Sequence, residues 1–63
     1  MRTYRVFDLC PSGSVTSPGR DFQAESDAAS VAHITLSMGD FDQSIWQGSR
    51  LVAELDHKTK MPK

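Results

Sequence analysis

The chain has 63 residues, of which 38% are hydrophobic and 24% are charged, and its formal net charge at pH 7 is −1. It is one domain at most, and a domain of this size buries only about 60% of the surface that its unfolded chain exposes. Its single cysteine, Cys10, excludes an internal disulfide, and with two histidines it falls short of the four ligands of a structural zinc site. We therefore expect no metal and no cofactor, and a partner subunit remains as a source of added stability.

Charge is distributed unevenly along the chain. Residues 1–56 carry eight acidic and four basic residues, a net of −4, and residues 57–63 add three lysines, Lys58, Lys60 and Lys63. This is not the pattern of a nucleic-acid-binding surface, which needs clustered bases. No apolar run approaches the roughly 20 residues that span a bilayer. Without a signal-peptide core at its N-terminus, and with a free cysteine, the protein is expected to be cytoplasmic.

A first hairpin is predicted from the N-terminal third. Residues 2–9 are rich in strand-forming side chains, and the run ends at Cys10-Pro11-Ser12-Gly13-Ser14, where proline and glycine favour a turn. A second strand follows from Val15, and Pro18-Gly19 interrupts it before Phe22. Because proline cannot donate to a β-ladder, this second strand is expected at a sheet edge, with a bulge or a break.

A helix is predicted from Ser26 or Asp27, either of which can cap its first turn, to a stop at Gly39. One face at helical spacing carries Ala28, Val31, Ala32, Thr35 and Leu36, and the stripe is widened by Ile34 and Met38. This stripe is expected to pack on the sheet. The predicted core therefore includes Val31, Ala32 and Leu36.

The segment SIWQGSRLVAEL, residues 44–55, is the clearest element. Gly48-Ser49 between two runs of high β-propensity predicts a two-residue hairpin turn with glycine first. With that turn Trp46 lies opposite Leu51, Ile45 lies opposite Val52, and opposed residues share a face. One face then carries the expected core residues Trp46, Leu51, Ala53 and Leu55. We expect Trp46 to belong mainly to the core, and the alternative is that it contacts a ligand or a partner.

These elements follow one another in the order ββαββ. The predicted fold is α+β: a four-stranded, antiparallel-rich sheet from two hairpins, with one helix packed on one face. Residues 1–56 form the single predicted domain. Residues 57–63 are polar and aperiodic, which predicts a disordered basic tail. The strand order, and the sheet face that meets the helix, are not determined at this level.

Three stretches of the chain resemble short uncharacterised bacterial proteins. They are the start YRVFDLCPSG, the D-A-A opening of the helix and the ending WQGSRLVAEL, which has the form W-x-G-x-R-x-V-A-x-L. The similarity covers residues 4–55. Many of those proteins have an acidic residue after the first strand, where this chain has Cys10-Pro11. The resemblance implies a bacterial protein with the hairpin–helix–hairpin fold, and it implies no activity.

Groups that could carry chemistry are scattered along the sequence. Nucleophilic use of Cys10 needs a nearby base, and the nearest histidine in the sequence, His33, is on the predicted helix. Asp40 and Asp42 lack the alternating oxygen ligands of a calcium loop and suit a solvated turn. His57 lies in the predicted tail. We therefore expect the protein not to be an enzyme.

The expected function follows from the sheet face that one helix cannot cover. That face keeps Ile45 and Val52 with one side of the first strand, which is either Tyr4 and Val6 or Phe7 and Leu9. An exposed apolar face often marks a partner surface, so we expect a small non-enzymatic interaction module, a homodimer or an accessory to another protein. The expected partner patch is Tyr4, Val6, Ile45 and Val52. The alternative is a weak nucleic-acid-associated regulator that uses Arg2, Arg5, Arg50 and the lysine tail.

Overall fold

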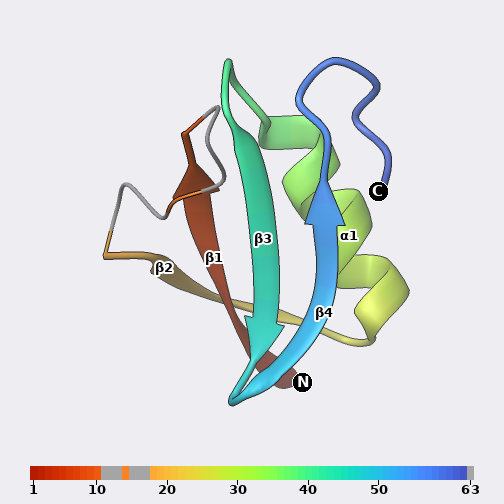
Figure 1. Cartoon of the computed structure of the whole chain (residues 1–63). Coiled ribbons are helices and arrows are strands. Elements are labelled where there is room, and N and C mark those ends of the chain that lie inside the picture. The colour runs from red at the N-terminus through yellow and green to blue at the C-terminus, as the bar shows by residue number, and fades with distance from the viewer. Residues whose placement is uncertain (11–13, 15–17, 63) are drawn as a thin grey trace.

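The computed structural model describes residues 1–10, 14 and 18–62. Its elements are β1 (Arg2–Leu9), β2 (Arg20–Ala24), α1 (Asp27–Ser37), β3 (Asp42–Gln47) and β4 (Arg50–Leu55). The strands form one antiparallel sheet in the order β2-β1-β3-β4, and α1 lies across one face of it (Figure 1). The predicted α+β fold with ββαββ order is confirmed. The predicted turn at residues 11–13 and the predicted strand start at Val15 lie outside the described residues.

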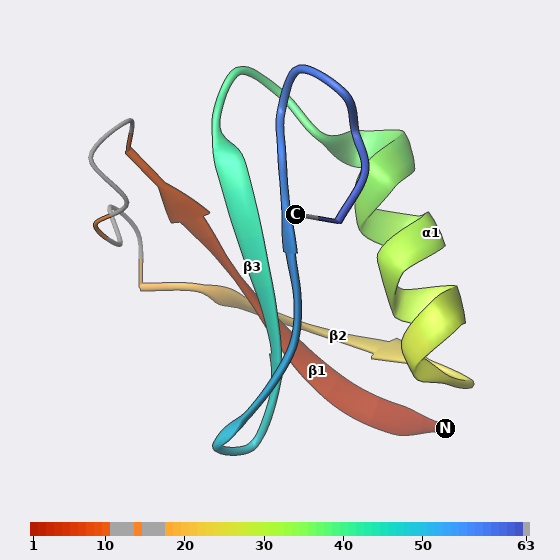
Figure 2. The same cartoon turned by 45° about the vertical axis from the view of Figure 1, so that its right-hand side comes forward.

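The two hairpins meet through β1 and β3, which are the central strands. Val6 of β1 lies opposite Ile45 of β3, and Tyr4 lies opposite Phe22 of β2. β2, which follows Pro18-Gly19, is the first strand in the sheet order and is therefore an edge strand, as the proline predicts. In a view turned by 45° from that of Figure 1, α1 lies on one side of the sheet only (Figure 2).

The β3–β4 hairpin contains a β-bulge. Gly48 has a φ of +60°, as a glycine-first turn allows, and Trp46 lies opposite Leu51 as predicted. Beyond that pair Ile45 lies opposite Ala53, so Val52 is an extra residue in β4. The predicted pairing of Ile45 with Val52 is wrong by this one residue.

The core lies between α1 and the sheet. It consists of Tyr4, Val6, Ala24, Ile34, Ile45 and Leu55, and none of these residues is more than 6% exposed. Burying a large aliphatic side chain fully contributes about 1.5–3 kcal/mol, so a few such residues hold most of the apolar stabilisation of this small domain.

The two faces of the sheet are exchanged relative to the sequence-based prediction. Three residues of the expected partner patch, Tyr4, Val6 and Ile45, are at most 3% exposed under the helix, and the fourth, Val52, packs against this core. Of the expected core residues, Leu55 is fully buried and Ala53 packs against the core. Trp46 is half-buried and Leu51 is 47% exposed on the opposite face.

The bulge explains this exchange. Without it, Ala53 and Leu55 would share a face with Trp46, and that face would be the more apolar one. The extra residue at Val52 moves Ala53 and Leu55 to the face of Ile45. The Ile45 face then holds most of the apolar area of the hairpin, and it is the face that packs on the helix.

The helix is rotated from its predicted orientation. Its buried residues are Ser30 and Ile34, whereas two predicted core residues, Ala32 and Leu36, are exposed, Leu36 by 90%. The third, Val31, is half-buried and packs against the core. The apolar stripe predicted for the helix did not include Ser30, because serine is polar. Its hydroxyl donates to the carbonyl of Asp27 at 2.6 Å, so it can be buried without an unsatisfied donor.

Residues 56–62 fold back on the body, which departs from the predicted disordered tail. The backbone amide of Asp56 donates to the carbonyl of Met61 at 3.0 Å, and Leu55 forms a β-bridge with Pro62. Lys60 Nζ donates to the carbonyl of Met38, just beyond α1, at 3.3 Å. Hydrophobic periodicity could not reveal these contacts, because they join backbone groups and a charge at a helix C-terminus.

The orientation of the helix can be tested with one pair of substitutions. Ile34→Ala should lower the free energy of unfolding by about 2–5 kcal/mol, because it opens a cavity in the core. Leu36→Ala, the matched control on the exposed side, should change it by no more than about 0.5 kcal/mol. Urea denaturation of both variants measures the difference. Equal losses would contradict the orientation.

Candidate functional site

The sheet face opposite α1 is the first candidate site. It carries Arg5 and Phe7 from β1, Ser44 and Trp46 from β3, and Leu51 from β4, because alternate residues of a strand share a face. The indole nitrogen of Trp46 donates to Ser44 Oγ at 3.3 Å, which orients the ring along its own strand. We call this surface the open face.

The open face is hollowed at its centre. A depression of about 580 Å³ is lined by Thr3, Tyr4, Arg5, Phe7, Asp21, Trp46, Gly48 and Ser49. Phe7 and Trp46 supply aromatic surface, and the β3–β4 turn supplies part of the rim. A hollow of this volume with aromatic walls and a few polar groups has the character of a binding surface.

The charged groups of the hollow form one ion pair. Arg5 Nε donates to Asp21 Oδ1 at 2.7 Å, and Arg5 Nη2 donates to Asp21 Oδ2 at 3.3 Å. The hydrogen bond from Arg5 lowers the pKa of Asp21, and the same bond raises the pKa of Arg5. The pair is exposed, so it contributes little to stability. Its effect is to present a cation and an anion side by side.

Gly19 is positioned by close contact with the open face. Its φ is +85°, and a Cβ atom at this position would lie 2.7 Å from Phe7 Cε1 and 3.1 Å from Arg5 Cδ. Only glycine fits both this conformation and this contact. Gly19 therefore holds the entry to β2 against the ring of Phe7.

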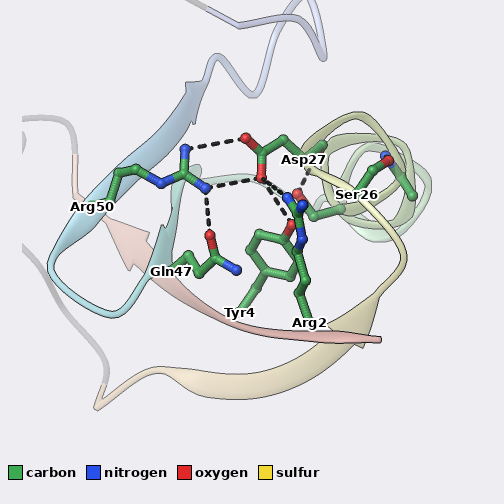
Figure 3. A network of polar contacts seen from close by, with 8 residues as sticks. Arg2, Tyr4, Ser26, Asp27, Gln47 and Arg50 are labelled. Atoms are coloured by element: carbon green, nitrogen blue, oxygen red, sulfur yellow. Dashed lines mark hydrogen bonds and ion pairs between the residues drawn. The ribbon is translucent and has the colours of Figure 1, made fainter.

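A second cluster joins the start of α1 to the sheet (Figure 3). Asp27 accepts hydrogen bonds from Tyr4 Oη at 2.8 Å and from both terminal nitrogens of Arg50, at 3.0 and 3.1 Å. Arg50 also donates to Gln47 Oε1 at 2.5 Å, and Arg2 Nη1 lies 3.9 Å from Asp27. The hydrogen bonds from Arg50 and then Tyr4 lower the pKa of Asp27. These bonds position the helix, so we assign the cluster to the scaffold.

A third cluster lies where the C-terminal turn meets β3. One ligand atom each from Asp42, Asp56 and His57 lies within 4.8 Å of the other two, and all three residues are half-buried. His57 Nδ1 is 2.5 Å from Asp42 Oδ1 and 3.8 Å from Asp56 Oδ1. Asp42 and His57 also line a small hollow with Cys10.

This third cluster was missed in the sequence because Asp42 is far along the chain from Asp56 and His57. The only local signal is the adjacent pair Asp56-His57, which is too common to predict a site. The other histidine, His33, is exposed on α1, where its ring stacks on Phe22 with centroids 5.2 Å apart. Cys10 is thus brought beside His57, and not beside the histidine that is nearer in sequence.

A polar hollow of about 210 Å³ lies near the C-terminal end of α1, lined by Asp8, Arg20, Ser37, Gly39, Asp40, Phe41 and Gln43. Gln43 is 5% exposed and its Nε2 donates to Asp8 Oδ1 at 2.6 Å. Its Oε1 has no hydrogen-bond partner among the described residues.

Comparison with protein-family models, with curated proteins and with solved structures finds no match to this chain. The resemblance to short bacterial proteins therefore stays a prediction, and the function has to be argued from geometry. No helix in the described part of the chain is long and apolar enough to cross a membrane.

The pKa shift of Asp27 predicts a dependence of stability on pH. Its folded pKa is below the ordinary value of 3.8, so its contribution is fully present above that value and is lost as pH falls through the folded pKa. Asp27→Asn should lower stability at pH 7 and flatten the acid limb between about pH 5 and 2. Thermal unfolding across this range measures it. The exposed loop variant Asp40→Asn is the control, and the same flattening in both would contradict the assignment.

The contact between Gly19 and Phe7 predicts a second matched pair. Gly19→Ala should lower the free energy of unfolding by about 1–3 kcal/mol, because the new Cβ meets the Phe7 ring and the positive φ is strained. Gly39→Ala should be nearly neutral, since a Cβ there meets nothing within 4 Å. Urea denaturation of both variants decides the point. A neutral Gly19→Ala would mean that the entry to β2 does not press on Phe7.

Proposed function

We propose that this chain is a small non-enzymatic binding module that self-associates through the open face of its sheet. The observation that carries the proposal is the open face, which is hollowed beside Trp46, exposes Leu51 and is not covered by α1. The proposed partner surface differs in its residues from the patch expected from the sequence. The earlier patch of Tyr4, Val6, Ile45 and Val52 belongs to the core side, so the partner surface is now built from Arg5, Phe7, Asp21, Trp46 and Leu51.

The charges of the open face support a second copy of this chain as the partner. Arg5 and Asp21 lie side by side, so a two-fold axis between them can bring each guanidinium to the carboxylate of the other copy. Such a face is complementary to itself in charge and apolar at Trp46. Charge complementarity of this kind sets register and partner choice more than affinity.

The size of the protein also supports association. A standard interface takes about 800 Å² from each partner, which is roughly a fifth of this chain's 4083 Å² of accessible surface. A partner subunit adds buried surface that the core of a 63-residue domain cannot supply by itself. The single cysteine of the chain accords with a cytoplasmic setting.

A non-enzymatic role accords with the lining of the hollow. The acid among its described lining residues, Asp21, is held by Arg5, and no histidine or cysteine stands beside it there. The alternative role at nucleic acid has less support. Arg5 and Arg50 are both paired with aspartates, and Lys60 is bonded to a backbone carbonyl, so these bases are committed to contacts within the chain.

Trp46→Asp and Leu51→Asp should each dissociate the proposed dimer. Loss of an aromatic anchor at the centre of an interface costs about 2 kcal/mol or more, so the dissociation constant should rise at least about thirtyfold. Sedimentation velocity over a concentration series measures association, and circular dichroism tests that both variants stay folded. Leu36→Asp, which charges an equally apolar but remote surface, is the control and should leave association unchanged.

Three results would contradict the proposal. One is a wild-type chain that stays monomeric at high concentration. Another is a dimer that Leu36→Asp disrupts as strongly as Trp46→Asp does. The third is a folded Ile45→Asp variant together with an unfolded Trp46→Asp variant, which would place the core on the other face.

A further inference from the structure

We infer that Asp42, Asp56 and His57 form a binding site for a divalent transition-metal ion of the zinc class. The site lies at the end of the sheet where β3, the end of β4 and the C-terminal turn meet. It is independent of the proposed self-association, because Trp46, Leu51 and the central hollow of the open face take no part in it.

The three donor atoms lie near, and not yet at, the spacing that one ion needs. Zinc binds imidazole nitrogen and carboxylate oxygen at about 2.0–2.2 Å, so two such ligands of one ion lie no more than about 4.4 Å apart. His57 Nδ1 lies 3.8 Å from Asp56 Oδ1, and one donor atom of each of the three residues lies within 4.8 Å of the others. Nδ1 and Asp42 Oδ1 form a hydrogen bond at 2.5 Å, which the ion replaces. Small side-chain rotations complete the site.

A hollow beside Asp42 and His57 leaves room for a fourth ligand. Asp42 and His57 line a space of about 30 Å³ together with Leu9, Cys10, Asp40 and Phe41. This is about the volume of one water molecule, so the ion can keep a water ligand there. The thiol-bearing residue Cys10 lies on the wall of the same space.

The donor set selects the kind of ion. Calcium and magnesium take oxygen ligands, whereas an imidazole with two carboxylates suits zinc and its neighbours in the first transition series. The turn itself does not compete with the ion. Asp42 Oδ1 accepts from the His57 amide at 2.9 Å and Asp56 Oδ1 accepts from the Lys58 amide at 2.9 Å, and a carboxylate oxygen has two lone pairs, so it can bind an ion and keep its amide bond.

Metal binding links two segments of the chain and so stabilises this small domain. The ion joins β3 to the C-terminal turn and adds to the hydrogen bonds of His57 with Asp42 and of Lys60 with the carbonyl of Met38. Binding energy at a site that the unfolded chain lacks is folding energy.

The experiment adds zinc chloride to the full metal-free chain and follows thermal unfolding and calorimetric binding. At a zinc concentration a hundredfold above the dissociation constant, the midpoint should rise by roughly 10 °C or more. Cobalt chloride should give the intense visible bands of a four-coordinate ion. Calcium and magnesium chloride are the comparison and should leave the midpoint unchanged.

The matched variants are His57→Ala and His33→Ala, which remove the two histidines of the chain one at a time. His57→Ala keeps the backbone amide that bonds Asp42, so the turn can still form, and it should weaken zinc binding at least about tenfold. Asp56→Asn should do the same. His33→Ala and Cys10→Ser should bind zinc as the wild type does.

Four results would overturn the site. They are a wild-type chain without saturable zinc binding up to millimolar metal, binding that survives His57→Ala and Asp56→Asn, equal loss in His33→Ala, and loss in Cys10→Ser alone. The last would assign binding to the thiol. Circular dichroism of each metal-free variant shows that weaker binding does not result from unfolding.

Discussion

The extra residue in β4 decides where the core of this protein lies. Side chains alternate along a strand, so one inserted residue transfers everything beyond it to the opposite face. Val52 has this effect: Ala53 and Leu55 join Ile45, and Trp46 is left with Leu51 on the other side. The helix then packs on the aliphatic face, and the aromatic face stays open. Both the core and the proposed partner surface therefore depend on this bulge.

Polar contacts hold the second layer in place. The carboxylate of Asp27 at the start of α1 binds Tyr4 from β1 and Arg50 from β4, so one side chain sets the helix against two strands. At the other end of α1, Lys60 bonds the carbonyl of Met38. Apolar burial between these ends is modest, with only Ser30 and Ile34 of the helix fully buried. In a domain this small, such contacts are a substantial part of what orients the layers.

The two proposed sites use different parts of the same sheet. The open face offers Trp46 beside an ion pair and suits a second copy of the chain. The cluster of Asp42, Asp56 and His57 suits a metal ion that fastens the C-terminal turn. Both sites would add to the stability of the fold. A domain of this length buries little surface of its own and gains stability from a partner or a metal.

The sequence by itself determined the order of the elements, the α+β fold, the turn at Gly48-Ser49 and the edge position of β2, because turn chemistry and strand propensity are local. Only the tertiary structure decided the sheet face, the helix rotation and the course of residues 56–62. A bulge leaves no trace in hydrophobic alternation, a buried Ser30 looks like a surface residue, and the turn is held by polar bonds between distant segments. The cluster around His57 follows the same rule, since Asp42 and Asp56 become neighbours only after β3 and β4 have paired.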